Sequence, residues 1–257
     1  MDILLYLIES FIFIFVVQIV FFAFAYFFKT DKVTDLSYSL TFILLALYLL
    51  VKNAVYSPDH VILTALILIW GLRLMFYLFI RILKIKTDKR FDGVREDFGK
   101  FAVFWTGQAI TIFIIMIPAI IVLASGAKTV NNLMLAGVVV WIVGFVIESF
   151  ADAQKFSFKN DLSNKGKFIK SGLWKYSRHP NYFGEMTVWW GIFIFSLPYL
   201  GGFTYLAVTG PLFITFILLF VSGIPPLEKK YDSIYSKDSK YQEYKKTTSI
   251  LIPWVSL

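Results

Sequence analysis

The chain has no cysteine among its 257 residues and only two histidines, His60 and His179. The lack of cysteine excludes disulfides, thiolate metal sites and a cysteine nucleophile. Two histidines are too few for a histidine-rich metal site, so we expect no bound metal. Neither a G-x-x-x-x-G-K-[ST] loop nor a G-x-G-x-x-G turn after a strand is present, so P-loop and Rossmann nucleotide binding are not supported.

Charged residues are also scarce, at 16%, where soluble domains have about 25%. Hydrophobic residues make up 58% of the chain and aromatic residues 19%. This composition predicts an all-α, polytopic membrane protein, a single membrane domain over 1–257 with seven transmembrane helices. The predicted spans are 3–28, 36–51, 61–83, 101–124, 133–153, 180–200 and 203–223, followed by a tail over 224–257.

The basic residues predict the orientation of these spans. Of the 25 Lys and Arg residues, all but three fall at the C-terminal ends of the first, third, fifth and seventh spans or in the segments after them; the exceptions are Lys52, Arg73 and Lys128. Because basic segments stay in the cytoplasm, we predict the N-terminus outside and the C-terminus in the cytoplasm. The membrane would be a bacterial inner membrane, or the endoplasmic reticulum in a eukaryote. Orientation also explains the net charge of +8, so we expect no nucleic-acid partner.

One polar stretch, G-L-W-K-Y-S-R-H-P-N-Y-F-G-E over 172–185, interrupts the apolar pattern. Pro180 suits the first turn of a helix, because its missing N–H would be unpaired there anyway. Asn181 and Glu185 are then four residues apart on one helix face. A carboxylate one turn inside a membrane helix is costly and usually functional, so we predict a functional site here.

A second pair of polar residues, Glu148 and Asp152, lies near the end of the fifth span, again four residues apart. Two carboxylates suit hydroxyl and amide donors, and nearby cations suit phosphates. The cations expected in the loop between spans five and six are Lys159, Lys167, Arg178 and His179. Arg178 and His179 precede a helix N-terminus, which favours anions. The residues thus predict a cytoplasmic pocket for a ligand with phosphate. The alternative is that Glu148 and Glu185 form structural ion pairs with the loop cations and that His179 caps the helix.

The stretch 172–191 resembles the signature of the DUF1295 family, membrane proteins related to the C-terminal region of steroid 5-alpha reductases. The resemblance extends to E-S-F-A-D-A-Q-K-F (148–156), V-S-G-I-P-P-L-E-K-K (221–230), W-G-L-R-L (70–74) and T-S-I-L-I-P-W (248–254). It implies a seven-helix membrane reductase that uses NADPH to saturate an activated carbon–carbon double bond.

The resemblance also implies residue roles. Asp152 matches a position near the adenosine part of the cofactor, and Asn181 and Glu185 match positions at the nicotinamide half. Glu148, which replaces an Asn of steroid reductases, is assigned with Asp152 to the ribose or adenine side. The residues expected at the phosphates are Lys159, Lys167 and Arg178, and those expected to pack around the cofactor are Trp174 and Tyr182.

On the substrate side, the second span lacks the Glu of steroid reductases, and Trp70 falls where their third-span Tyr would be. Asp35, Tyr77 or Tyr182 remain as candidates to polarise or protonate the substrate. We expect a lipophilic substrate from the bilayer, either steroid-like, an enone or an enoyl lipid. The sequence does not indicate the oligomeric state.

Two other functions stay open. The Arg178-His179-Pro180 run is similar to that of membrane isoprenylcysteine and phospholipid methyltransferases, which implies S-adenosylmethionine as an alternative cofactor. A non-enzymatic lipid-binding membrane protein is the second alternative, although it leaves the polar residues near the membrane mouth unexplained.

Overall fold

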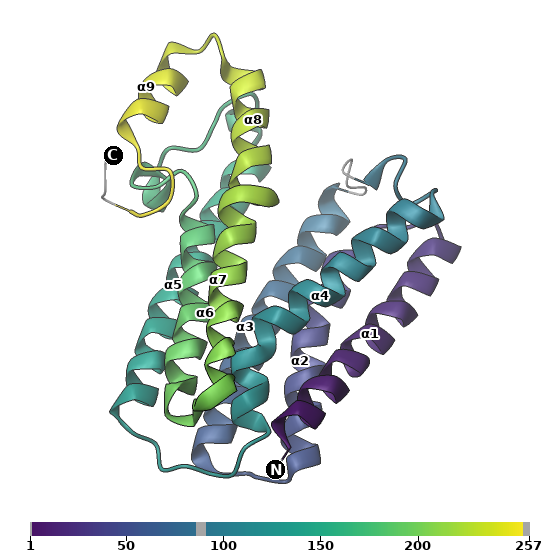
Figure 1. Ribbon diagram of the computed structural model, residues 1–257. Coiled ribbons are helices and arrows are strands. Elements are labelled where there is room, and N and C mark those ends of the chain that lie inside the picture. The colour runs from purple at the N-terminus through teal and green to yellow at the C-terminus, as the bar shows by residue number, and fades with distance from the viewer. Residues whose placement is uncertain (1, 86–90, 254–257) are drawn as a thin grey trace. The chain divides into compact units, whose positions relative to one another are not determined.

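The computed structural model describes residues 2–85 and 91–253, and within them the fold is helical, as predicted (Figure 1). In these two ranges the β-type pairing is a single parallel bridge between Ser177 and Ser249. Met1, residues 86–90 and residues 254–257, including Trp254 of the tail motif, lie outside the described residues. The chain forms two compact units: unit 1 comprises Met1–Leu135 and Ile192–Gly210, and unit 2 comprises Ala136–Gly191 and Pro211–Leu257.

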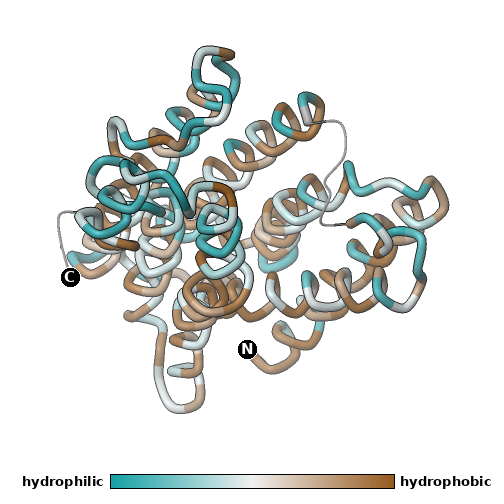
Figure 2. The backbone as a smooth tube through the Cα atoms, turned by 90° about the horizontal axis from the view of Figure 1, so that it is seen from above, coloured by the Kyte–Doolittle hydropathy of each residue, from teal (hydrophilic) through white to brown (hydrophobic). Residues whose placement is uncertain are grey.

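Long apolar helices account for most of the chain. The elements are α1 (Ile3–Phe27), α2 (Thr34–Asn53), α3 (Pro58–Ile85), α4 (Phe98–Leu123), α5 (Asn132–Asn160), α6 (Pro180–Ser196), α7 (Thr209–Phe216), α8 (Ile224–Tyr235) and α9 (Ser239–Thr247). Six segments of the described chain are long and apolar enough to cross a membrane: α1 to α5 and the helical stretch Gly202–Tyr235. Figure 2 shows mainly apolar helices, with hydrophilic residues concentrated in the connecting segments. The protein is therefore an integral, multi-pass membrane protein.

Several bounds differ from the predicted spans. At 20 residues, α2 is longer than the predicted 36–51, because the Thr34 hydroxyl donates to the Asp31 carbonyl at 2.7 Å and starts the helix earlier. The predicted span 180–200 is α6, with 17 residues, followed by a 3-10 turn. The predicted span 203–223 is not a uniform helix: it changes from 3-10 to α and ends in a π-helical turn, Ile217–Val221.

The C-terminal end of the fifth predicted segment also differs from the structure. α5 continues to Asn160, so Lys159 lies in its last helical turn and not in the loop where we expected it. The Asn160 side-chain amide donates to the Phe156 carbonyl at 2.7 Å, which satisfies a backbone oxygen at the helix end. The predicted tail contains two helices, α8 and α9. α8 starts at Ile224, directly before two prolines, which suit the first turn of a helix.

Unit 1 packs α1 to α4 through aromatic side chains and one buried polar cluster. Phe22 of α1 contacts Trp105 of α4 with ring centroids 6.4 Å apart, and Phe42 of α2 meets Trp70 of α3 at 5.2 Å. Gln18 of α1 donates to the Thr41 hydroxyl at 2.8 Å and accepts from Gln108 of α4 at 2.9 Å. Polar side chains placed in an apolar region hold helices together when they bond to each other.

Unit 2 contains most of α5, from Ala136, most of α6, up to Gly191, and α7 from Pro211. It also contains α8, α9 and the loop between α5 and α6. Trp190 of α6 donates its indole N–H to the Thr215 hydroxyl of α7 at 3.3 Å. Phe168 of the loop lies against Tyr235, Tyr241 and Tyr244 with ring centroids 5.3–5.5 Å apart. The loop and the last two helices thus share one aromatic cluster.

Candidate functional site

Glycines set the spacing between α5 and α6, the two helices that carry the predicted carboxylates. A Cβ atom on Gly184 of α6 would lie 2.5 Å from the backbone nitrogen of Glu148. A Cβ on Gly144 of α5 would lie 2.6 Å from the backbone nitrogen of Val188, and a Cβ on Gly191 would lie 2.6 Å from the backbone nitrogen of Trp141. Only glycine permits such an approach of two backbones. The side chains at this contact are therefore held on closely packed backbones.

Asp152 and Asn181 meet directly across this contact. The Asn181 side-chain nitrogen donates to the Asp152 carboxylate at 3.2 Å. Asp152 and Glu148 are 6% and 3% exposed, and as predicted they lie one turn apart on α5. Within the described chain the Asn181 amide oxygen is buried and has no hydrogen-bond partner. A buried polar atom without a partner is unfavourable, so this oxygen is an available acceptor for a ligand N–H or O–H.

Glu185 lies one turn after Asn181 on α6 and is half-buried. Tyr182, which is also half-buried, stacks on the His179 ring with centroids 5.7 Å apart and planes 8° from parallel. The predicted start of α6 at Pro180 is confirmed. The first turn of α6 thus carries Asn181 and Tyr182, and Glu185 follows in the second.

Arg178 and His179 lie just before α6, as predicted, and both bond to Glu228 of α8. The Arg178 guanidinium donates to Glu228 at 2.5 Å, and His179 Nε2 lies 2.8 Å from the other carboxylate oxygen. His179 is 1% exposed. Burial lowers the pKa of His179 below its usual range; Lys155 and Arg178 lower it too, and the Glu228 carboxylate opposes them. Neutral His179 donates from Nε2, which fixes its tautomer.

Sequence reasoning did not identify Glu228 as a partner of Arg178 and His179. The signal was present, because Glu228 lies in the V-S-G-I-P-P-L-E-K-K motif and one turn into a helix that begins with two prolines. No sequence pattern indicated that residue 228 contacts residues 178 and 179. Arg178 and His179 are thus both anchored by Glu228, which is not one of the carboxylates that we expected to form structural ion pairs.

The loop before α6 is fixed to α5 by two side chains. The Trp174 indole donates to the Ala151 carbonyl at 3.1 Å, and Trp174 is 2% exposed. The Gln154 side chain accepts from the Leu173 backbone N–H at 2.9 Å. Gly172 permits this bond, because its φ of 61° is left-handed and a Cβ there would lie 2.5 Å from Gln154. Trp174 therefore positions the loop next to Asp152.

Lys159 and Lys167 are both exposed, the first in the last turn of α5 and the second in the loop that follows. Their positions differ from those of Arg178 and His179, whose side chains are mostly buried against Glu228. Of the predicted site residues, Glu148, Asp152 and His179 are buried, and Asn181 and Arg178 are partly buried.

The substrate candidates Asp35 and Tyr77 lie in unit 1. The Asp35 carboxylate accepts from the Arg81 guanidinium at 2.6 Å, and both side chains are about one-third exposed. Tyr77 lies one turn before Arg81 on α3, so the two share a helix face. Trp70 is 1% exposed and packs against Phe42. An ion-paired carboxylate only accepts hydrogen bonds, so Asp35 can position a donor group but cannot itself donate a proton to a substrate.

Comparison with known proteins was informative at the level of the family. A family model described as "Protein of unknown function (DUF1295)" matches residues 9–248. The chain belongs to the DUF1295 family. Two similar proteins are the 3-oxo-5-alpha-steroid 4-dehydrogenases 1 of Rattus norvegicus and Mus musculus, 28% and 26% identical over 121 residues. Each match covers 47% of this chain, and it covers 41% of the rat protein and 42% of the mouse protein.

A third relative of this DUF1295 protein is a probable O-methyltransferase of Ustilaginoidea virens, 35% identical over 66 residues. That match covers 26% of the chain and 23% of the relative. The matched region thus spans about two fifths of the steroid dehydrogenases and about a quarter of the methyltransferase. No solved structure matches the chain.

Proposed function

We propose that this DUF1295 protein is an NADPH-dependent membrane reductase that saturates an activated carbon–carbon double bond of a lipophilic substrate. The observation that carries the proposal is the partly buried Asp152–Asn181 pair, whose buried amide oxygen lacks a partner within the described chain. Membership of the family and similarity to two steroid dehydrogenases support the same reaction class. The substrate is steroid-like, an enone or an enoyl lipid.

The residues present fit a nicotinamide cofactor. When bound, NADPH would supply a hydride for the β-carbon of the polarised alkene. Asn181 and Glu185 would hold the carboxamide, because the unpartnered Asn181 oxygen accepts an N–H and Glu185 lies on the same face of α6. Asp152 and Glu148 would accept from ribose hydroxyls or the adenine amine. The residues assigned to the phosphates are Arg178, Lys159 and Lys167.

Completion of the reduction needs a proton at the α-carbon. Tyr77 and Tyr182 carry hydroxyl donors, whereas Asp35 is paired with Arg81. We therefore assign proton donation to a tyrosine hydroxyl. Tyr182 is adjacent to Asn181 in α6, and its ring is held against His179.

The same proposal includes a topology. α6 and the 3-10 turn after it form a further span, sixth in chain order, which brings the number of spans to seven. The N-terminus lies outside and the C-terminus lies in the cytoplasm. This orientation places the basic segments around α8, α9 and the α5–α6 loop in the cytoplasm, as positive-inside segments require. It also exposes Arg178 to soluble cofactors.

A second candidate is an S-adenosylmethionine-dependent methyltransferase. Similarity to the probable O-methyltransferase and the Arg178-His179-Pro180 run favour it. S-adenosylmethionine has no phosphate, so it gives the cations a smaller role.

Thermal unfolding of the purified protein in detergent separates the two candidates. NADPH, NADH and S-adenosylmethionine are titrated in parallel, since a ligand at 100 times its Kd stabilises the native state by about 2.7 kcal/mol. We expect NADPH to raise the unfolding temperature of the wild type and to lose this effect with Asn181→Leu. Lys237→Gln, a change at an exposed tail lysine, is the control that should keep the response. A response to S-adenosylmethionine without one to NADPH would contradict the proposal.

A further inference from the structure

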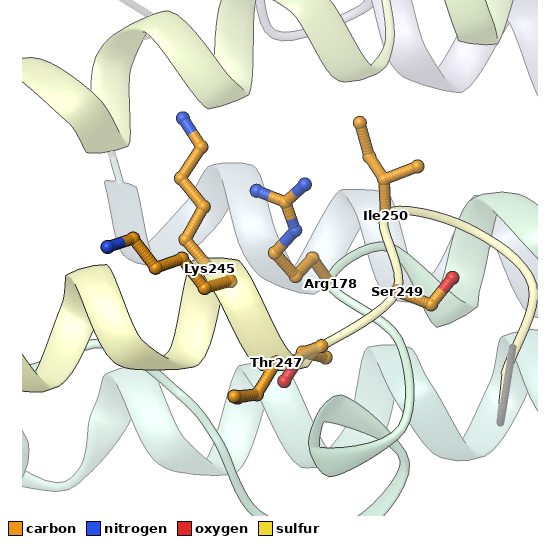
Figure 3. Close-up of a pocket in the computed structure, with 7 residues that line it drawn as sticks. Arg178, Lys245, Thr247, Ser249 and Ile250 are labelled. Atoms are coloured by element: carbon orange, nitrogen blue, oxygen red, sulfur yellow. The ribbon is translucent and has the colours of Figure 1, made fainter. Parts of the chain in front are cut away.

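A small basic pocket lies where the end of the chain meets the stretch before α6. It has a volume of about 170 Å³ and is lined by Arg178 and residues 245–250 (Figure 3). A phosphate group fits within this volume. Three of its lining residues are cations, Arg178, Lys245 and Lys246, and three carry hydroxyl groups, Thr247, Thr248 and Ser249.

The pocket is fixed by bonds on both of its walls. The Arg178 backbone N–H donates to the Ser249 carbonyl at 2.8 Å, and the Ser177 hydroxyl donates to the Leu251 carbonyl at 2.6 Å. Upstream, the Tyr244 hydroxyl donates to the Trp174 carbonyl at 2.6 Å. The tail is thus attached to the loop before and after the pocket, so the pocket is formed without a ligand.

The cations exceed the carboxylates that hold them. Arg178 is bonded to Glu228, and Lys245 donates to both carboxylate oxygens of Asp232 at 2.7 Å. Among the residues that the structure describes, no carboxylate pairs with Lys246, the third cation of the lining. The Arg178 Nε atom is buried and, within residues 2–85 and 91–253, has no hydrogen-bond partner. The pocket therefore offers a positive charge and an unused N–H donor, which together suit an anion.

We propose that this pocket binds a terminal phosphate, and that the group is the 2′-phosphate of NADPH. The assignment rests on the function proposed above. A 2′-phosphate is attached to the cofactor through a single ester oxygen, so it can enter a small pocket. The pyrophosphate is esterified to a nucleoside at each end, so it needs a channel that is open on both sides. Lys246 and the Arg178 Nε–H are then the groups that distinguish NADPH from NADH.

Binding constants for NADPH and NADH, measured on the full chain in nanodiscs of phosphatidylcholine, test the assignment. Lys246→Gln removes the uncompensated charge at an exposed position, and Lys240→Gln changes an exposed lysine of the same helix that does not line the pocket. One charge-assisted hydrogen bond is worth about tenfold in affinity. We expect Lys246→Gln to weaken NADPH about tenfold and leave NADH unchanged, and Lys240→Gln to change neither.

Equal weakening of NADPH and NADH, or of neither, overturns the assignment and leaves the proposed function standing. Failure of the wild type to bind NADPH overturns the proposed function itself. A competition on the wild type needs no variant: 2′-AMP should displace NADPH at lower concentration than 5′-AMP does, and the reverse order contradicts the assignment. If phosphatidic acid in the nanodisc displaces NADPH in a manner that Lys246→Gln abolishes, the pocket takes a lipid headgroup and the 2′-phosphate assignment is wrong.

Discussion

The side-chain amide of Asn181 donates to the carboxylate of Asp152 at 3.2 Å, which joins the first turn of α6 to α5. The bond orients the amide so that its oxygen is left as an acceptor in a buried position. A carboxylate and an amide oxygen on closely packed helices form a rigid acceptor surface for hydroxyl and amide donors. This surface is the part of unit 2 on which the proposed cofactor site depends.

Glu228 should be necessary for the stability of the site. Its carboxylate is 13% exposed and holds both Arg178 and His179. Glu228→Gln leaves the Arg178 charge without its partner, and removing one member of a largely buried ion pair is destabilising. We expect a loss of about 2 kcal/mol or more, measured by the thermal unfolding midpoint in detergent. Glu243→Gln, at an exposed position of α9, should change stability by less than about 0.5 kcal/mol.

Stability should fall in mild acid because of His179. Burial lowers its pKa below the ordinary value of about 6.5, so between these two values the unfolded chain binds a proton that the folded chain does not. The contribution of neutral His179 to the free energy of unfolding is therefore fully present above about pH 6.5, and it decreases as the pH falls toward the lowered pKa. Unfolding midpoints measured from pH 7.5 to 5 should show this decrease.

His179→Gln isolates that effect. A glutamine amide can still donate to Glu228 but does not titrate, so the decrease should become shallower. His60 is present in both proteins and does not affect the comparison. Parallel pH curves for the wild type and the variant would show that His179 is not the source.

The approach of α5 and α6 should not tolerate a methyl group at Gly184. A Cβ there would lie 2.5 Å from the Glu148 backbone nitrogen, and relieving the overlap would shift the helix backbones. We expect Gly184→Ala to destabilise the protein by about 1–3 kcal/mol and to weaken NADPH binding. Gly107→Ala in α4 is the matched control, because nothing lies within 4 Å of its Cβ. That change should be neutral or stabilising by up to about 1 kcal/mol.

The sequence predicted the helical class and the start of α6, because Pro180 marks a first turn and residues four apart share a face. It also predicted that Asp152 and Asn181 belong to one site. It did not predict the anchoring of Arg178 and His179 by Glu228, since spacing in sequence cannot show which helix packs opposite. The contact between the tail and the loop before α6 was not predicted for another reason. Ser249 and Leu251 accept hydrogen bonds from the loop through backbone carbonyls, which every residue carries. Lys159 lies in the added length of α5, which its polar C-terminal residues did not indicate, and Lys167 lies in the loop beyond that helix.

Direct binding of NADPH tests the central claim that the Asp152–Asn181 surface holds this cofactor. Tryptophan fluorescence of the purified protein is followed during titration with NADPH, for the wild type, for Asp152→Asn and for Lys240→Gln. We predict saturable binding at one site per chain, weakened about tenfold by Asp152→Asn, since one charged hydrogen bond is lost, and unchanged by Lys240→Gln. Saturable binding that Asp152→Asn leaves unchanged, or no binding of NADPH by the wild type, would contradict the claim.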